Sequence, residues 1–207
     1  MGRRVIDHLV YATPELAPTV RDLGRRLGVE LTAGGRHVGL GTMNFLAAIG
    51  SGAYLEVLGP DPDAPAHTPP FGLAGLTEPR LATWAVRVSD LAGAVERARA
   101  AGYDPGEIRS MSRRREDGVL LEWRLAYPEP DSGDGVVPFL IDWGDSPHPS
   151  AGAAPGAELL SFGGVHPRPD LISAKLAALG VSLPVTEGPR PALRAVLRTP
   201  AGEVELS

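Results

Sequence analysis

The chain has 207 residues, of which 43% are hydrophobic, and its formal net charge is −5 at pH 7. This length suits one large domain or two small ones, and no apolar run approaches the roughly 18 residues that span a bilayer. The sequence contains no cysteine, which excludes disulfides, zinc–thiolate sites and cysteine nucleophiles. We therefore expect a cytoplasmic protein with no membrane partner and, because no basic face is evident, no nucleic-acid partner.

The first predicted elements form a unit that begins with a strand at 4–12. A helical pattern follows, in which Leu16, Leu23 and Leu27 recur at helical spacing, and it ends at Gly28. Thr13 is the expected N-cap of this helix, and the closing glycine suits a left-handed C-cap. After a glycine-laced loop at 34–41, the unit closes with two strands.

Two further segments repeat this order. The strand-like runs lie at 42–50 and 53–59 in the first unit, at 80–88, 118–128 and 136–144 in the second, and at 157–165, 193–200 and 202–207 in the third. The second and third helices end at Gly102 and Gly180, and Ser89 is the expected N-cap of the second. One unit cannot bury its sheet alone, so the repetition predicts an α+β protein built from three βαβββ modules.

Proline- and glycine-rich stretches separate the modules. The expected organisation is a first module at 1–60, a connector at 61–79, a second module at 80–146, a linker at 147–156 and a shorter third module at 157–207. Because the number of modules is odd, a homodimer is a further expectation.

The repeated unit, with "IDHLVYATPEL" at 6–16 and "GAYLEVLG" at 52–59, resembles the vicinal oxygen chelate superfamily of glyoxalases, bleomycin-resistance proteins and extradiol dioxygenases. Within it, the segments at 34–62, 79–91 and 136–150 are similar to bacterial glyoxalase-like domain proteins. The resemblance implies that paired modules form an open half-barrel around a small-molecule ligand. It also implies that any metal is held by residues on the first and last strands of a module.

Carried over by position, the resemblance makes His8 and Glu56 the metal ligands, with Zn, Ni, Mn, Fe or Co as the divalent ion. Without a metal, His8 is a half-buried histidine bonded to the backbone, and Glu56 is an exposed edge residue or the partner of an arginine. In the second module the first-strand position falls at Thr83 or Trp84, and Ile141 aligns with Glu56.

Neither later module offers a second complete pair. Asp142 is one residue past the aligned position and should face the other side of its strand, because side chains alternate. The third module has no first-strand ligand, but its last strand contains Glu205.

The glycine-laced loop contains His37, which is either a third ligand, general base or anion contact, or an ordinary surface-loop histidine. Arg36 beside it is a further ligand-binding candidate. Asn44 either orients a substrate oxygen or caps a turn. The remaining histidines are expected to be exposed, because they lie in or beside proline-rich segments: His67, His148 and His166.

Aromatic residues concentrate in the second module and either line a small-molecule pocket or fill the core; they are Trp84, Trp123, Trp143 and Phe139. An arginine run, Arg113 to Arg115, could grip a phosphate or carboxylate, but a solvated turn is the preferred interpretation.

The predicted function is the binding of a small oxygenated metabolite in a sheet-lined cup. A metal on His8 and Glu56 would support isomerase or lyase chemistry through an enediolate-like anion, with Glu56 or His37 moving the proton. Two alternatives stay open: a metal-free protein that sequesters a drug or metabolite, and a structural member without catalysis. No nucleotide cofactor is expected, because no phosphate loop or dinucleotide fingerprint is found.

Overall fold

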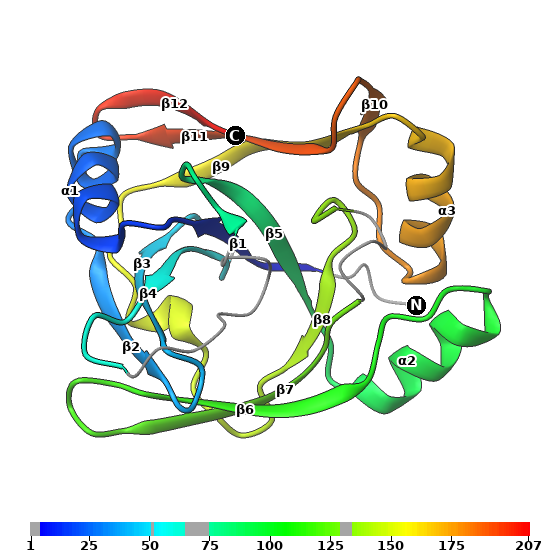
Figure 1. Cartoon of the computed structure of the whole chain (residues 1–207), viewed down its shortest axis with the longest axis horizontal. Coiled ribbons are helices and arrows are strands. Elements are labelled where there is room, and N and C mark those ends of the chain that lie inside the picture. The colour runs from blue at the N-terminus through cyan, green and yellow to red at the C-terminus, as the bar shows by residue number, and fades with distance from the viewer. Residues whose placement is uncertain (1–4, 51, 65–74, 129–133) are drawn as a thin grey trace.

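The computed structural model describes residues 5–50, 52–64, 75–128 and 134–207 (Figure 1). Three βαβββ modules follow one another along the chain. The first comprises β1 (Val5–Ala12), α1 (Leu16–Leu27), β2 (Thr32–His37), β3 (Thr42–Ala48) and β4 (Tyr54–Pro60). The second comprises β5 (Arg80–Arg87), α2 (Leu91–Ala100), β6 (Ile108–Arg114), β7 (Leu120–Ala126) and β8 (Phe139–Asp142). The third comprises β9 (Glu158–His166), α3 (Pro169–Ala178), β10 (Val185–Glu187), β11 (Ala192–Thr199) and β12 (Gly202–Leu206).

The first two modules close into one eight-stranded barrel with the strand order β1-β4-β3-β2-β6-β7-β8-β5. In each module the first strand pairs in parallel with the last, β1 with β4 and β5 with β8. The two modules join through antiparallel pairs at both edges, β1 with β5 and β2 with β6. This arrangement confirms the α+β class and the βαβββ modules expected from the repeat.

The third module keeps the order of elements but not the order of strands in its sheet. Its four strands run β10-β9-β11-β12, so the first strand pairs in parallel with β10 rather than with the last strand. Figure 1 shows this sheet lying across one side of the barrel, with α1 near one end and α3 near the other. Trp84 of β5 and Phe162 of β9 meet edge to face at this junction, with ring centroids 5.2 Å apart.

Alternation along β1 separates two hydrophobic clusters. Leu9 and Tyr11 belong to the larger cluster, which lies between the outer face of the barrel, the helices and the third sheet. Val10 and Ala12 belong to a smaller cluster with residues of the other barrel strands, inside the barrel. The barrel wall thus has two buried faces, and its interior is the natural place for a ligand cavity.

The helix ends follow the sequence patterns at their C-termini more closely than at their N-termini. Gly28, Gly102 and Gly180 all have a positive φ, as predicted for left-handed caps. The predicted N-caps were wrong by one or two residues. Asp90, rather than Ser89, accepts the Gly93 backbone N–H and caps α2, while the cap position of α1 is Glu15. No helix in the described ranges is long and apolar enough to cross a membrane.

Two predicted loops are strands that join the modules. The glycine-laced segment begins inside β2, and the arginine run begins inside β6. Arg36 pairs with Arg114 and His37 with Arg113 across the β2–β6 junction that closes the barrel. Each of these strands also pairs within its own module, β2 with β3 and β6 with β7, and the additional pairing between modules is a contact that the local sequence pattern does not reveal.

Candidate functional site

A cavity lies inside the barrel. One part of its wall is polar, and it gathers side chains from β1, β2, β3, β4 and β6: His8, His37, Thr42, Asn44, Glu56 and Arg113. The first module supplies all of these except Arg113. Residues far apart in the sequence therefore meet because the modules close on each other.

The rest of the wall is apolar, with four aromatic residues among its members: Tyr54, Trp123, Phe139 and Trp143. The ring of Tyr54 stacks on the imidazole of His8 with centroids 4.7 Å apart. Trp123 and Trp143 lie 5.1 Å apart, centroid to centroid. This combination of aromatic surface and a few convergent polar groups is typical of small-molecule sites. Of the four aromatic candidates from the sequence, three line the cavity: Trp123, Trp143 and Phe139.

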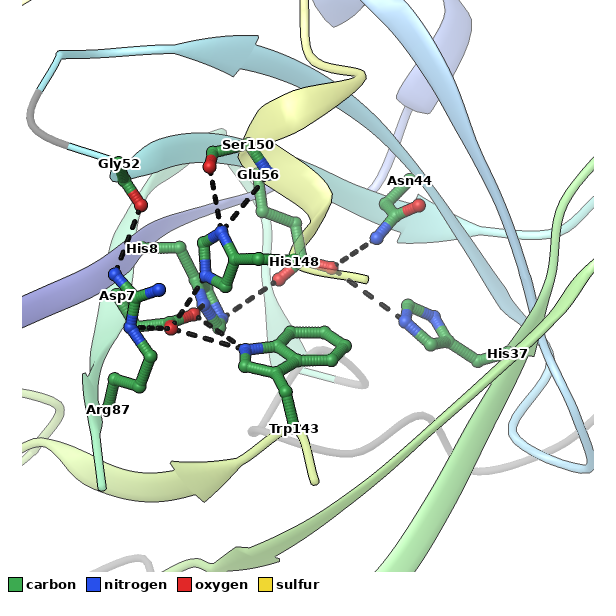
Figure 2. A network of polar contacts seen from close by, with 10 residues as sticks. All are labelled: Asp7, His8, His37, Asn44, Gly52, Glu56, Arg87, Trp143, His148 and Ser150. Carbon is green, nitrogen blue, oxygen red and sulfur yellow. Dashed lines mark hydrogen bonds and ion pairs between the residues drawn. The ribbon is translucent and has the colours of Figure 1, made fainter. Parts of the chain in front are cut away.

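Glu56 sits in the middle of β4, between Leu55 and Val57, whose side chains face the outer core. Its own side chain is buried inside the barrel, with 7% of the residue exposed. An isolated charge at such a site would be costly. Oε1 accepts a 2.5 Å hydrogen bond from the Asn44 amide, and Oε2 lies 3.5 Å from His8 Nε2 (Figure 2). Both oxygens of Glu56 thus have polar neighbours that offset its burial.

Asn44 connects Glu56 to a buried cation. Arg113 donates from Nη1 to Asn44 Oδ1 over 2.9 Å, while the Asn44 amide donates to Glu56. Arg113 is 3% exposed, and burial lowers the pKa of its guanidinium, which still stays charged in proteins. The prediction of a solvated turn was wrong for Arg113, because pairing of β6 with β2 turns this side chain into the barrel.

Asp7 is the second carboxylate of the network, and it is fully buried. His8 Nδ1 lies 2.6 Å from Asp7 Oδ1. Since an ionised carboxylate only accepts hydrogen bonds, the proton between them sits on Nδ1 and leaves His8 Nε2 directed toward Glu56. The pairing of β1 with β5 shifts register between Ile6 and His8, and this irregularity lets two consecutive residues join the same network.

Three further donors converge on Asp7. Trp143 Nε1 donates over 3.2 Å and His148 Nε2 over 2.9 Å to Oδ2, and Arg87 Nε lies 3.4 Å from the same oxygen (Figure 2). Burial alone would raise the pKa of Asp7, but the hydrogen bonds from His148 and His8 lower this pKa well below its usual value. Asp7 therefore stays ionised and fixes the tautomer of both histidines.

His37 lies on the other side of Glu56. Its Nε2 is 3.8 Å from Glu56 Oε1, and its Nδ1 is 3.0 Å from the hydroxyl of Thr42. Burial lowers the pKa of His37 to about 4, with a smaller contribution from the charge of Arg113. His37 is therefore neutral at neutral pH, and its imidazole can donate or accept a single proton at the cavity wall.

His8 and Glu56 match two positions of a metal site. Two ligands that each lie about 2.1 Å from one ion are about 3.0–3.4 Å apart, close to the 3.5 Å between His8 Nε2 and Glu56 Oε2. Catalytic zinc sites use three protein ligands. Among the described residues, no group of three or more His, Cys, Asp or Glu side chains is arranged to hold a metal ion. The donor set is thus incomplete for a catalytic metal, and Arg113 already places a positive charge at this wall.

The other modules add no histidine or carboxylate to the described wall of the cavity. The second module lines it with Arg113 and otherwise uncharged side chains, among them Ile141, which the sequence aligned with Glu56. Of the two first-strand positions expected from the sequence, Trp84 belongs to the outer core and Thr83 does not line the cavity. Asp142 does not line the cavity and instead pairs with Arg124, 2.7 Å away. Glu205 lies on the edge strand β12, exposed and away from the barrel interior.

Two of the ligand-binding candidates lie outside the cavity. Trp84 pairs with Leu9 across β1 and β5 and belongs to the outer core, where its Nε1 donates to the Val136 carbonyl over 2.9 Å. Arg36 is exposed and forms ion pairs with Asp61 and, at 2.6 Å, with Asp63. Alternation places Arg36 on the face of β2 opposite to His37.

Four charged or imidazole residues of the network were not assigned to the site from the sequence: Asp7, Arg87, Arg113 and His148. His148 was expected to be exposed, but it is mostly buried and its imidazole bonds Asp7 and Ser150. His166 was expected to be exposed as well, and it is buried with Nδ1 accepting the Arg168 N–H. His67 lies outside the described residues. The only available signal for Asp7 was a carboxylate in an otherwise apolar first strand.

Comparison with known proteins places the chain in a family. Residues 6–180 match the family model described as a glyoxalase-like domain. A hypothetical protein from Staphylococcus aureus has a similar structure, with a TM-score of 0.70, 13% sequence identity, and coverage of 90% of this chain and 87% of the other. No match was found among curated proteins.

Methylmalonyl-CoA epimerases also appear among the similar structures. The enzyme from Mycobacterium tuberculosis has 22% identity and a TM-score of 0.42, covering 67% of this chain and 87% of its own. The enzyme from Streptomyces coelicolor, in complex with 2-nitronate-propionyl-CoA, has 21% identity and a TM-score of 0.47, covering 70% and 98%. The extent of the family match, together with the βαβββ barrel, shows that this chain belongs to the glyoxalase-like domain family of the vicinal oxygen chelate superfamily.

Proposed function

We propose that the protein binds a small oxygenated metabolite in the barrel cavity and transfers a proton on a carbon next to the carbonyl group of this metabolite. The observation that supports this proposal is the position of Glu56. Its carboxylate lies in an aromatic-lined cavity, with Oε1 bonded to Asn44 and with Oε2 beside His8 Nε2. A carboxylate held in this way is suited to act as a general base.

The proposed reaction begins with the transfer of a proton from the substrate carbon to Oε2 of Glu56. The electron pair of the broken C–H bond moves to the carbonyl oxygen and forms an enediolate-like anion. Arg113 supplies a fixed positive charge at the same wall, and neutral His37 supplies a hydrogen-bonding group, so both can stabilise the developing negative charge. Return of the proton from Glu56 to the neighbouring carbon, with transfer of the hydroxyl proton between the two substrate oxygens, completes an isomerisation. Departure of a leaving group with its bonding electron pair, followed by its protonation from Glu56, instead completes a lyase reaction.

Exchange of the substrate proton with deuterium tests this step without knowledge of the whole reaction. A panel of 2-hydroxyketones and 2-oxo acids is incubated with the protein in D₂O, and loss of the proton signal is followed by NMR. Glu56→Gln should slow the exchange at least about 100-fold, because the base is removed. Glu205→Gln is the matched control, since Glu205 is an exposed carboxylate outside the barrel. Equal rates in the two variants would contradict the role of Glu56.

The chelation expected from the family resemblance is tested on the same proteins. Metal content is measured for the wild type, His8→Ala and Glu56→Ala. If the wild type contains near-stoichiometric metal and both variants lose it, His8 and Glu56 are ligands of a bound ion. Exchange that persists in metal-free protein would instead support the reaction by side chains alone.

A second candidate function is the sequestration of a small apolar molecule without catalysis. The four aromatic residues of the cavity wall favour it, because aromatic faces bind apolar ligands well. Quenching of tryptophan fluorescence by such a ligand, diminished in Trp123→Phe, together with no deuterium exchange in any substrate tested, would support the binding protein.

A further inference from the structure

A second cavity, which Arg113 also lines, opens beside the barrel cavity. Its wall is formed by the start of β2, by β6 and β7, and by the segment around the short 3-10 helix η3 (Pro149–Ala151). Arg113 is the one residue that lines both cavities. The second cavity is thus a separate space that shares one buried cation with the candidate active site.

The charged residues that line this second cavity are both arginines, and one of them, Arg115, also pairs with Asp117 over 2.8 Å. The other is Arg113, and none of the lining residues is an Asp or Glu. His148 also lies in the wall, but both of its ring nitrogens are already bonded, to Asp7 and Ser150. Two cations without a carboxylate among the lining residues favour an anionic ligand.

Arg113 has unused hydrogen-bonding capacity. It donates from Nη1 to Asn44, but among the described residues its buried Nε has no hydrogen-bond partner, and no carboxylate oxygen forms an ion pair with it. A buried guanidinium that is only partly satisfied is costly. An anion that accepts from it would remove part of this cost.

The local backbone permits the guanidinium to lie against β2. A Cβ at Gly34 would stand 2.7 Å from Arg113 Nη1, so a larger residue would displace the side chain. Gly34 lines the second cavity together with Gly152. Gly34 thus lets Asn44 and the Arg113 guanidinium pack directly against β2, whereas a Cβ at Gly152 would meet no atom within 4 Å.

We infer that the second cavity is an anion-binding site that holds a small oxyanion, a phosphate or a carboxylate group, between Arg113 and Arg115. This site goes beyond the proposed proton transfer, because binding there requires no reaction in the barrel cavity. Arg115 also pairs with Asp117 at 2.8 Å on the surface, so it lies at the mouth, whereas Arg113 lies at the buried end.

Isothermal titration calorimetry at constant ionic strength, with inorganic phosphate and with acetate as separate probes, measures this binding. We expect saturable binding of one anion per chain, and the tighter of the two probes indicates whether the site prefers phosphate or carboxylate. Arg115→Gln should weaken binding by about tenfold, the effect of one charge-assisted hydrogen bond, and Arg113→Met should abolish it. Arg114→Gln is the matched control, because the Arg114 side chain bonds the Gly118 carbonyl at the surface and should leave binding unchanged.

The position of the anion is checked by NMR in the wild-type protein, which avoids any effect of a substitution on folding. Phosphate should shift the backbone amides of Gly34 and Gly152. No saturable binding of either probe, an equal loss in Arg114→Gln, or shifts confined to His37 and the Trp123 indole would overturn the inference. The last result would place the anion in the barrel cavity, so failure of this site and failure of the proposed function are distinguishable.

Discussion

Asp7 and His8 are neighbours in the sequence, and their side chains are joined within the structure by a 2.6 Å contact between His8 Nδ1 and Asp7 Oδ1. In a regular strand consecutive side chains face opposite sides, so this contact requires the register shift between Ile6 and His8. The consequence is a chain of polar contacts that runs from Asp7 through His8 to Glu56.

Asp7→Asn should destabilise the protein by about 2–4 kcal/mol. The side-chain NH2 group of asparagine is a donor, and it would face at least one of the N–H groups from which Asp7 now accepts a hydrogen bond. Urea unfolding at pH 7 measures the change. Asp22→Asn is the control, since Asp22 is exposed and pairs with Arg25 at the surface. That substitution should cost less than about 0.5 kcal/mol, and similar costs for the two variants would show that the Asp7 network contributes little.

Stability should fall in mild acid because of His37. Burial lowers the pKa of His37 to about 4, below the 6.5 of an exposed histidine. As the pH falls through this range the unfolded chain takes up the proton first, so the free energy of unfolding decreases from about pH 6.5 to about pH 4. The shift corresponds to a loss of roughly 2–3 kcal/mol between pH 7 and pH 4.5.

Urea unfolding of the wild type and His37→Gln at both pH values measures this loss. The variant should lose less stability than the wild type between the two. Parallel losses in both proteins would assign the acid sensitivity to other groups. Asp7 does not interfere, because its unfolded-state pKa lies below this window and its native pKa is lower still.

Substitution should distinguish Trp84, which stabilises the outer core, from Trp123 and Trp143, which line the cavity. Trp84→Phe removes the hydrogen bond to the Val136 carbonyl and part of the contact with Phe162, and should cost about 1–3 kcal/mol of stability. It should leave the affinity for a cavity ligand unchanged. Trp123→Phe should instead weaken ligand binding and change stability little. Thermal unfolding and ligand titration of both variants measure the two quantities.

Gly34→Ala should disturb the connection between Arg113, Asn44 and Glu56. Its Cβ would lie 2.2 Å from Asn44 Oδ1 and 2.7 Å from Arg113 Nη1, so one of these side chains must move. We expect a loss of about 1–3 kcal/mol in urea unfolding and slower deuterium exchange. Gly152→Ala is the control, because a Cβ there meets no atom within 4 Å and its φ is −109°. If both variants unfold alike, close packing at Gly34 is not important.

The sequence alone was sufficient to predict the repeated modules and to show which residues of β1 share a face. Three helices that end at glycine, each followed by extended segments, predicted the βαβββ modules, because periodicity and C-caps are local properties. Alternation in β1 placed His8 with Val10 and Ala12, and Val10 pairs with Glu56 in the structure. The family resemblance pointed to His8 and Glu56, and the glycine-laced segment and the strand after it pointed to His37 and Asn44, although their chemical roles stay predictions.

Tertiary structure alone decided which arginine, tryptophan and histidine side chains join the site. Arg113 enters the barrel because β6 pairs with β2 of another module, and Trp84 leaves it because β5 pairs with β1 in the register that sets Trp84 beside Leu9. His148 reaches Asp7 from 141 positions away. Local sequence fixes which residues share a face of one strand, but the register between strands of different modules depends on contacts between distant segments, and that register determines which faces enclose the cavity.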